Sequence, residues 1–361
     1  MDLESEEMIA FWKNKKVLLT GHTGYKGTWM ALMLEYLGAK VYGYSLPIEK
    51  ETFYGKVVPQ IEQEWANDIA DSTKVMEVIQ TVKPEIIIHL ASHSSLEGSQ
   101  EIPGYILRTN LMGPINILEG VRKTLEVKAV VIVTSDKCYF NQDKNIKYTE
   151  AERLWATDPY SASKVGQELI TGCYIDTFFR GTKRNVGVGT ARASNVIGPG
   201  DDNLTRLLPY VFNCYMKGLR PQIRNPKTIR PWQYVLDVLR GYLLLAEKLY
   251  NTVDCGNLYC GAYNFGPNDD GFVTVEEIVK MISWYFDETP YDVISGEGHI
   301  RHEAQILMLD STKAKDLLKW IPKRSLQQAI KDTIYVIKKQ EKIELAVISR
   351  ELIRDYFKGE L

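Results

Sequence analysis

Paired cysteines, long apolar runs and an excess of basic residues are all missing from this sequence. The five cysteines include no Cys-x-x-Cys pair and are odd in number, which argues against a disulfide framework and against a zinc site. No apolar run reaches the roughly 20 residues that cross a bilayer, and the first residues are acidic where a signal peptide is basic and then apolar. We therefore expect reduced thiols, no metal, no membrane partner and a cytoplasmic location.

The composition is that of a packed protein. The chain has 361 residues, 45% of them hydrophobic and 25% charged, which is enough for one large domain with a smaller one or for two ordinary domains. Lys and Arg number 44 and Asp and Glu number 46, a formal net charge of −2. This balance does not favour a nucleic-acid partner, so any phosphate site must be local.

Short apolar runs alternate with amphipathic stretches through the first half of the chain. The runs cover residues 16–20, 40–44, 85–90, 129–134 and 185–190. They are continuously apolar, which is typical of parallel strands covered by helices on both faces. A helical pattern over residues 28–37 follows the first run and ends at Gly38. We predict an α/β fold with a Rossmann-type, doubly wound parallel sheet.

The pattern changes after about residue 196. Loops rich in Gly, Pro, Asn and Arg alternate there with helical patterns over residues 236–250 and 275–285, and residues 262–267 predict a strand that returns to the sheet. The charged residues 338–344 predict the solvated face of a C-terminal helix. The domains expected are a nucleotide-binding one of residues 1–195 and about 230–268, and a smaller, interleaved α/β substrate-binding one of residues 196–229 and 269–361.

A glycine-rich turn follows the first predicted strand and opens a helix. It consists of Gly21, His22, Thr23, Gly24, Tyr25, Lys26 and Gly27. Glycines let the backbone approach a pyrophosphate, whose charge the helix start stabilises, so the turn predicts a dinucleotide site rather than only a tight turn. Residues 42–45 include neither an acid that would bind the ribose 2′-hydroxyl of NAD nor an arginine that would bind the 2′-phosphate of NADP. These residues therefore do not distinguish between the two cofactors. Asp68 and Ile69 are candidates for the adenine or for an ordinary helix cap.

Two further motifs fall at the same predicted edge of the sheet. Tyr160 and Lys164 are one turn apart in a helix that begins near Pro159, so an ammonium at Lys164 would lower the pKa of the Tyr160 phenol and make it a base. Residues 134–137 follow a strand as a capping turn or as part of a ligand site. With the glycine turn, they predict a nicotinamide-dependent dehydrogenase site.

These residues resemble those of the extended short-chain dehydrogenase/reductase superfamily, and more closely those of the CDP-glucose 4,6-dehydratases. The resemblance covers nearly the whole chain, at residues 21–27, 134–138, 158–164, 191–198, 223–226, 229–233 and 264–267. Dehydratases of the thymidine type have Thr-Asp-Glu where this chain has Ser135, Asp136 and Lys137, and the Ser-Asp-Lys version is similar to the cytidine branch. The resemblance implies NAD as cofactor, bound by Gly21, Thr23, Gly24, Tyr25, Lys26, Gly27, Asp68, Ile69, Leu90, Ala91, Tyr160 and Lys164.

The resemblance also implies an internal redox cycle on a nucleoside diphosphate hexose, with CDP-glucose as the expected substrate. Tyr160 takes the 4-hydroxyl proton, Ser135 holds the same oxygen, and hydride passes from C4 to NAD and later to C6. Lys164 binds the nicotinamide ribose. Asp136 protonates the departing 6-hydroxyl, and Lys137 either relays the C5 proton as a base or stabilises the enolate as a cation.

Arginines of the second half are the candidates for the sugar-nucleotide phosphates. The resemblance places Arg230 and Asn195 there, and the guanidinium of Arg224 suits a diphosphate. Arg206 is a further, weaker candidate. Without the resemblance, solvated loops are the favoured interpretation of these arginines.

Residues 92–99 depart from the family pattern. Where the family has paired arginines, this chain has Glu97 and Gly98, in a segment expected to border both nicotinamide and sugar, so the nucleotide and the hexose stay open. His93 is interpreted as a polar loop residue without a role in proton transfer. The aromatic residues Trp232 and Tyr234 are interpreted as packing rather than base-stacking residues.

Two other functions share part of this pattern. An epimerase or reductase of the same fold would also use Tyr160, Lys164 and the glycine turn, and a non-catalytic NAD-binding scaffold would need only the turn. Asp136 and Lys137 favour the dehydratase. On family grounds we expect a homodimer or homotetramer formed through two packed helices.

Overall fold

A parallel sheet forms the centre of the protein. The computed structural model describes residues 3–48, 50–94, 98–251, 258–287, 291–293 and 304–359. Its main sheet has the strand order β10-β6-β5-β4-β1-β2-β3, and all of its neighbouring strands are parallel. The strands are β1 (Lys16–Thr20), β2 (Lys40–Ser45), β3 (Gln63–Ala66), β4 (Ile86–His89), β5 (Ala129–Val133), β6 (Gly187–Ala193) and β10 (Gly261–Phe265).

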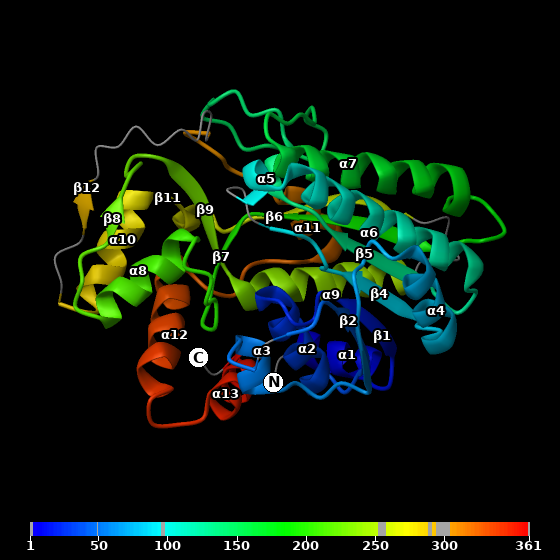
Figure 1. Cartoon of the computed structure of the whole chain (residues 1–361), viewed down its shortest axis with the longest axis horizontal. Coiled ribbons are helices and arrows are strands. Elements are labelled where there is room, and N and C mark those ends of the chain that lie inside the picture. The colour runs from blue at the N-terminus through cyan, green and yellow to red at the C-terminus, as the bar shows by residue number, and fades with distance from the viewer. Residues whose placement is uncertain are drawn as a thin grey trace.

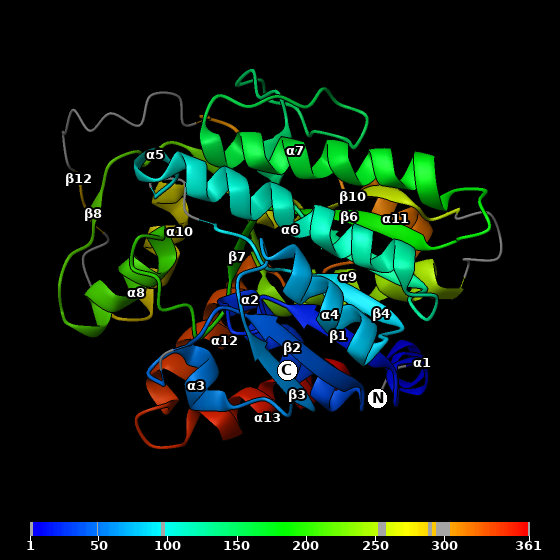
Figure 2. The same ribbon diagram turned by 45° about the vertical axis from the view of Figure 1, so that its right-hand side comes forward.

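Helices cover both faces of this sheet (Figures 1 and 2). One layer holds α1 (Leu3–Trp12), α2 (Tyr25–Tyr36) and α9 (Val235–Asn251), and the other holds α4 (Ser72–Val82), α6 (Pro103–Lys123) and α7 (Pro159–Tyr174). Successive residues of β1 face opposite layers: Leu19 lies in the core with α2 and α9, and Leu18 in the core with α4 and α6. Because both faces are buried, the central strands β1, β4 and β5 are largely apolar, and the sheet confirms the doubly wound prediction.

The second half of the chain adds a smaller region beside the carboxyl ends of the strands. Two small sheets lie there, β11-β9-β7 and β12-β8. The strands are β7 (Asn195–Ile197), β8 (Gln222–Ile223), β9 (Ile229–Tyr234), β11 (Phe272–Thr274) and β12 (Asp292–Val293). The remaining helices are α3 (Phe53–Val57), α5 (Gly98–Glu101), α8 (Leu207–Met216), α10 (Val275–Trp284), α11 (Thr312–Leu318), α12 (Leu326–Lys339) and α13 (Leu345–Lys358).

The structure corrects the sequence prediction near the C-terminus. Residues 338–344 are not the face of one helix: they hold the end of α12 and the turn before α13. Helix α13 packs against α2 and α3, and its Phe357 carbonyl accepts a hydrogen bond of 2.8 Å from the Ser5 hydroxyl. The division into two domains at residues 195, 230 and 268 stays a prediction, and strand β10 lies in the main sheet where a returning strand is predicted.

No helix of the described residues is long and apolar enough to cross a membrane. The four described cysteines, Cys138, Cys173, Cys214 and Cys260, are free thiols, and Cys255 lies outside the described residues.

Candidate active site

The glycine turn is shaped as a phosphate cradle. Gly21 ends β1 with φ +70°, and a Cβ there would lie 2.6 Å from the Ala91 nitrogen. A Cβ on Gly27 would lie 2.0 Å from the Gly21 carbonyl oxygen. Helix α2 begins after Gly24 without a side-chain cap, so the first amides of the helix are available to an anion. These residues fit a dinucleotide pyrophosphate.

The Gly21→Ala variant is expected to lose dinucleotide binding. The new methyl group would meet backbone atoms of Leu90 and Ala91, and the left-handed conformation costs a non-glycine residue roughly 1–2 kcal/mol. Titration with NAD, together with thermal unfolding, measures both effects. The control is Gly104→Ala on α6, where a Cβ meets nothing within 4 Å: it should bind NAD normally and gain up to about 1 kcal/mol. Normal NAD binding by Gly21→Ala would contradict the cradle.

The predicted adenine end of the site is built differently from the common pattern. The Thr23 hydroxyl bonds the Ser45 hydroxyl at the end of β2 at 2.6 Å, so a hydroxyl pair occupies the place where an acid is common. The Asp68 carboxylate accepts the Ala70 amide at 2.9 Å, which is the local capping arrangement. Ile69 is buried in the core under α4. His22 is buried against Gly43, and burial lowers its pKa to about 4, so the ring is neutral.

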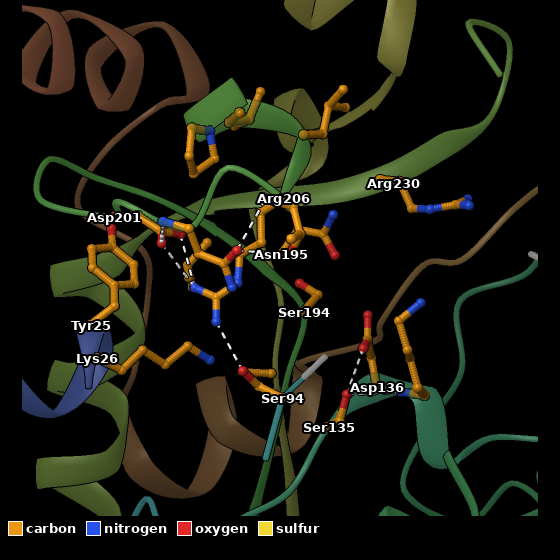
Figure 3. Close-up of a pocket in the computed structure, with 18 of the residues that line it drawn as sticks. Tyr25, Lys26, Ser94, Ser135, Asp136, Ser194, Asn195, Asp201, Arg206 and Arg230 are labelled. Atoms are coloured by element: carbon orange, nitrogen blue, oxygen red, sulfur yellow. Dashed lines mark hydrogen bonds and ion pairs between the residues drawn. The ribbon is translucent and has the colours of Figure 1, made fainter. Parts of the chain in front are cut away.

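A cavity of about 850 Å³ lies at the carboxyl ends of β1, β4, β5 and β6 (Figure 3). Most of the predicted site residues line it: Gly21, Gly24, Tyr25, Lys26, Gly27, Leu90, Ser135, Asp136, Lys137, Tyr160, Lys164, Asn195, Arg206, Arg224 and Arg230. Thr23, Asp68, Ile69 and Ala91 do not line it. The structure therefore brings the glycine turn, the Tyr-Lys pair, the Ser-Asp-Lys turn and the arginines together in one cavity, as parallel strands ending at one edge require.

Helix α7 carries the Tyr160 and Lys164 pair. Asp158 caps the helix by accepting the Ser161 amide at 2.8 Å, and Pro159 occupies its first turn. The Lys164 ammonium donates to the Ser92 hydroxyl at 2.9 Å and to Gln167 Oε1 at 3.1 Å. Its Nζ atom lies 5.8 Å from the centre of the Tyr160 ring. Ser92 is a partner of Lys164 that the sequence did not reveal, because it comes from the loop after β4.

The electrostatics of this pair differ from the expectation. Burial raises the pKa of Tyr160 to about 12, although its hydrogen-bonding contact with Ser135 acts in the opposite direction. Burial, and then the nearby Lys26 ammonium, lower the pKa of Lys164 to about 7. The predicted lowering of the pKa of Tyr160 is wrong for the protein alone, because desolvation dominates, Asp136 and Asp158 act in the same direction, and the Ser135 contact and Arg206 do not outweigh them. Tyr160 is a neutral phenol at neutral pH, and Lys164 titrates close to neutral pH.

The turn after β5 presents a buried carboxyl group. The single 3₁₀ turn of Asp136–Cys138 is capped by Ser135, whose hydroxyl accepts the Lys137 amide at 3.2 Å and donates to Asp136 Oδ1 at 3.1 Å. Asp136 Oδ2 is buried and has no hydrogen-bond partner among the described residues. Burial raises the pKa of Asp136 in spite of Lys137 and Ser135, which act to lower it. A carboxyl group with a raised pKa and an unpartnered oxygen, on a residue that lines the cavity, is suited to donate a proton.

The predicted substrate arginines have different surroundings. Arg230 is buried on β9, and Arg224 is exposed at the cavity mouth. Arg206 pairs with Asp201 at 2.9 and 3.1 Å and donates to the Ser94 hydroxyl at 2.9 Å (Figure 3). Arg206 thereby joins the loop before α8 to the loop after β4. Sequence analysis missed Asp201 and expected only the segment 92–99, not Ser94 itself, near the site, since the contact of Arg206 with both residues forms only when the loops fold together.

The atypical segment borders the cavity through alternate residues. Ser92 and Ser94 line the cavity, whereas the His93 ring lies edge-on to Tyr105 at 6.2 Å. Asn110 Oδ1 accepts a hydrogen bond from the His93 amide at 2.8 Å, and Asn110 Nδ2 donates one to the His93 carbonyl at 3.1 Å, so the backbone of His93 is anchored to α6. Glu97 lies outside the described residues.

The two aromatic residues of β9 are buried in the core. Tyr234 packs there, as predicted, and Trp232 also lines the cavity. No group of three His, Cys, Asp or Glu side chains in the described part of the chain is arranged to hold a metal ion.

Known proteins match both the sequence and the fold. The family model described as GDP-mannose 4,6 dehydratase matches residues 18–333. CDP-glucose 4,6-dehydratase of Salmonella typhimurium is 39% identical over 326 residues, which cover 89% of each chain. A structure of dTDP-glucose 4,6-dehydratase from Bacillus anthracis in complex with NAD superposes with a TM-score of 0.76 at 22% identity, covering 91% of this chain and 98% of that one. A structure of UDP-glucose 4-epimerase from Thermotoga maritima superposes with a TM-score of 0.76 at 22% identity, and the match covers 90% of this chain and 99% of that one.

The fold and site define a Rossmann-type protein of the extended short-chain dehydrogenase/reductase class, with the phosphate cradle and the Tyr-Lys pair in one cavity. Within that class, the chain belongs to the GDP-mannose 4,6 dehydratase family. The resemblance found in the motifs is thereby confirmed.

Proposed function

We propose that this protein is an NAD-dependent hydro-lyase that converts CDP-glucose to CDP-4-keto-6-deoxyglucose. The observation that carries the proposal is Asp136, a buried carboxyl group with a free oxygen, on a turn that lines the same cavity as Tyr160. An oxidoreductase that only removes and returns a hydride has no need of this acid. The 39% identity to a curated CDP-glucose 4,6-dehydratase supports the choice of substrate.

The excess of positively charged side chains in the cavity is consistent with the binding of two diphosphate groups. Among the described residues that line it, the cations are Lys26, Lys137, Lys164, Arg206, Arg224 and Arg230, and the carboxylates are Asp136 and Asp201. Guanidinium and ammonium groups bind diphosphate oxygens through charge-assisted hydrogen bonds. One diphosphate belongs to the cofactor at the glycine turn, and the other to the sugar nucleotide near Arg224 and Arg230.

The residues at the start of α2 and on α7 would hold NAD. When bound, NAD supplies the acceptor for the C4 hydride, returns that hydride to C6, and brings a positive ring that favours the Tyr160 phenolate. Lys164 reaches the cofactor ribose from α7, and its protonated form also favours the phenolate. Tyr160 Oη then removes the proton of the 4-hydroxyl, with the Ser135 hydroxyl beside the same oxygen.

The residues of the turn after β5 catalyse the loss of water. Oxidation at C4 makes the C5 proton acidic, and Lys137 acts on that side of the sugar as a base or as a cation that stabilises the enolate. Asp136 protonates the departing 6-hydroxyl, which its raised pKa allows. Elimination leaves a double bond between C5 and C6. Return of the hydride to C6 together with a solvent-derived proton to C5 gives the product, which leaves as the 4-keto-6-deoxy sugar nucleotide without net consumption of cofactor.

The test is incubation of the purified protein with CDP-glucose in deuterated water, with and without added NAD. Loss of one water with deuterium at C5 supports the proposal. Parallel reactions with dTDP-, UDP- and GDP-hexoses measure the nucleotide preference. Turnover of a different nucleotide hexose would replace the proposed substrate, and a 4-epimer without loss of water would identify an epimerase.

We further propose a homodimer in which α6 and α7 pack against the same helices of a second copy. The two helices lie side by side on the outside of the sheet (Figure 2), and Leu169 on α7 is 62% exposed. Leu169→Asp is expected to shift the protein to monomers, because burying the new carboxylate in an apolar contact between the two copies costs free energy. Light scattering after gel filtration measures the mass, and Leu125→Asp, with a 78% exposed residue beyond the end of α6, is the control. An unchanged mass for Leu169→Asp would contradict this interface, and a tetrameric wild type would extend it.

A further inference from the structure

A buried carboxylate behind the catalytic turn joins three elements of the site. Glu168 accepts hydrogen bonds from Thr134 at 2.5 Å, from Thr190 at 2.7 Å and from Arg192 at 2.8 Å. Glu168 is on α7, Thr134 follows β5, and Thr190 and Arg192 are on β6. The Glu168 and Arg192 side chains are both 4% exposed.

The contacts continue from Arg192 to the strand β10. Arg192 donates to the Tyr139 hydroxyl at 2.8 Å, and Tyr139 donates to Asn264 Oδ1 at 2.7 Å. The Asn264 amide nitrogen donates to the Tyr148 carbonyl at 2.8 Å. Arg192, Tyr139 and Asn264 contact no ligand in the proposed mechanism, although Arg192 and Asn264 lie in motifs that the chain shares with its family.

The position of Glu168 gives this pair a role beyond stability. A buried ion pair is weak evidence for stability, since desolvation of the two charges offsets much of their attraction. Thr134, however, directly precedes Ser135 and Asp136, and Glu168 lies one helical turn after Lys164. Glu168 is thus the link between the turn that carries the acid and the helix that carries Tyr160 and Lys164.

We propose that Glu168, held by Arg192, is a positioning residue that fixes the turn of Ser135 and Asp136 relative to Tyr160 and Lys164 on α7. The inference rests on the proposed function, in which oxidation at C4 and loss of the 6-hydroxyl must follow one another on the same bound sugar. A displacement on the order of 1 Å between reacting groups costs about 100-fold in rate, so the link affects turnover without contacting the substrate.

The charge of Glu168 has a second, measurable consequence. The titratable and charged groups near Lys164 are Lys26 from α2, His89 from β4, Cys138 from the turn after β5, and Tyr160 and Glu168 from its own helix. Burial and Lys26 lower the pKa of Lys164, and Glu168 opposes them. Loss of the Glu168 charge should therefore lower the pKa of Lys164 further.

The first test compares two threonines that bind the same carboxylate. Thr134→Val removes the hydroxyl next to the catalytic turn, and Thr190→Val removes the matching hydroxyl on β6. Each variant loses one similar buried hydrogen bond, so both should show similar decreases in melting temperature. For Thr134→Val we expect kcat to fall roughly 10- to 100-fold with little change in KM, and reduced cofactor to accumulate. Thr190→Val should keep kcat within about twofold. Equal kcat values for the two variants would overturn the proposal.

The second test is the pH profile of Glu168→Gln, which keeps the shape of the side chain and removes its charge. Lys164 acts in its protonated form, so activity falls as the pH rises through its pKa. The descending limb of kcat should therefore move to lower pH in Glu168→Gln than in wild type and Thr190→Val. If Glu168→Gln folds and the descending limb of its pH profile stays at the wild-type pH, the proposed effect of Glu168 on the pKa of Lys164 is contradicted. If Glu168→Gln does not fold, the comparison of Thr134→Val with Thr190→Val tests the positioning role.

Wild-type turnover of CDP-glucose tests the proposed function separately. If another nucleotide hexose proves to be the substrate, the same ratios are measured with it, because the positioning concerns the hexose chemistry and not the base.

Discussion

Asp136→Asn is expected to oxidise C4 of the bound sugar but to lose the elimination of water. Asparagine keeps the shape and the hydrogen bond from Ser135, yet it has no carboxyl proton for the departing 6-hydroxyl. Loss of a general acid lowers the rate of its step by roughly 100- to 10,000-fold. The hydride would remain on the cofactor, so the near-ultraviolet absorbance of reduced nicotinamide should rise and persist in a single turnover.

The matched control is Asp201→Asn, which removes the other carboxylate of the cavity. Asp201 pairs with Arg206, so its loss should change binding of the sugar nucleotide while oxidation and water loss remain linked one to one. Dehydration by Asp136→Asn at the wild-type rate would remove Asp136 from the mechanism. That result would also favour an epimerase or reductase, which shares Tyr160 and Lys164 but needs no acid at this position.

Tyr160→Phe is expected to abolish the reaction at its first step. Without Oη, no group at this position takes the 4-hydroxyl proton, and we expect kcat to fall roughly 100- to 10,000-fold. In contrast to Asp136→Asn, reduced cofactor should not accumulate, because the hydride never leaves C4. Rapid mixing of NAD-loaded protein with CDP-glucose separates the two variants by the absorbance of the cofactor.

Tyr242→Phe on α9 provides the control for the loss of a phenol. Tyr242 is fully buried, and its hydroxyl has no hydrogen-bond partner among the described residues. Removal of an unpartnered hydroxyl is close to neutral or stabilising, so this variant should keep its kcat within about twofold. Formation of reduced cofactor by Tyr160→Phe at the wild-type rate would show that another group is the base.

Local patterns predicted which segments of the first half meet at the carboxyl edge of the sheet. The glycine turn, the capped start of α7 and the apolar strands are each fixed by short stretches of chain, and the parallel sheet brings the ends of β1, β4 and β5 to one edge. The short strand β3 was missed, because Gln63–Ala66 is an edge strand with polar, exposed residues. The prediction of a helix face for residues 338–344 is wrong, because a charged run looks the same in a solvated helix and in a turn between two helices.

Contacts between loops that are distant along the chain could not be predicted from the sequence. Arg206 was predicted only as a weak phosphate ligand, and its partners Asp201 and Ser94 became visible when the loops before α8 and after β4 met over the cavity. The pKa of Tyr160 was also predicted in the wrong direction. Spacing along a helix shows which charge is near, but the extent of burial, which dominates here, depends on every element around the site.

The sequence by itself determined the class of fold, the phosphate cradle and the chemical identity of the groups Ser135, Asp136, Lys137, Tyr160 and Lys164. These depend on local spacing and on the periodicity of buried strands. The tertiary structure decided which of those groups are charged, where the arginines find partners, and that Glu168 and Arg192 meet behind the catalytic turn. The physical reason is that desolvation and ion pairing arise only between segments that folding brings together.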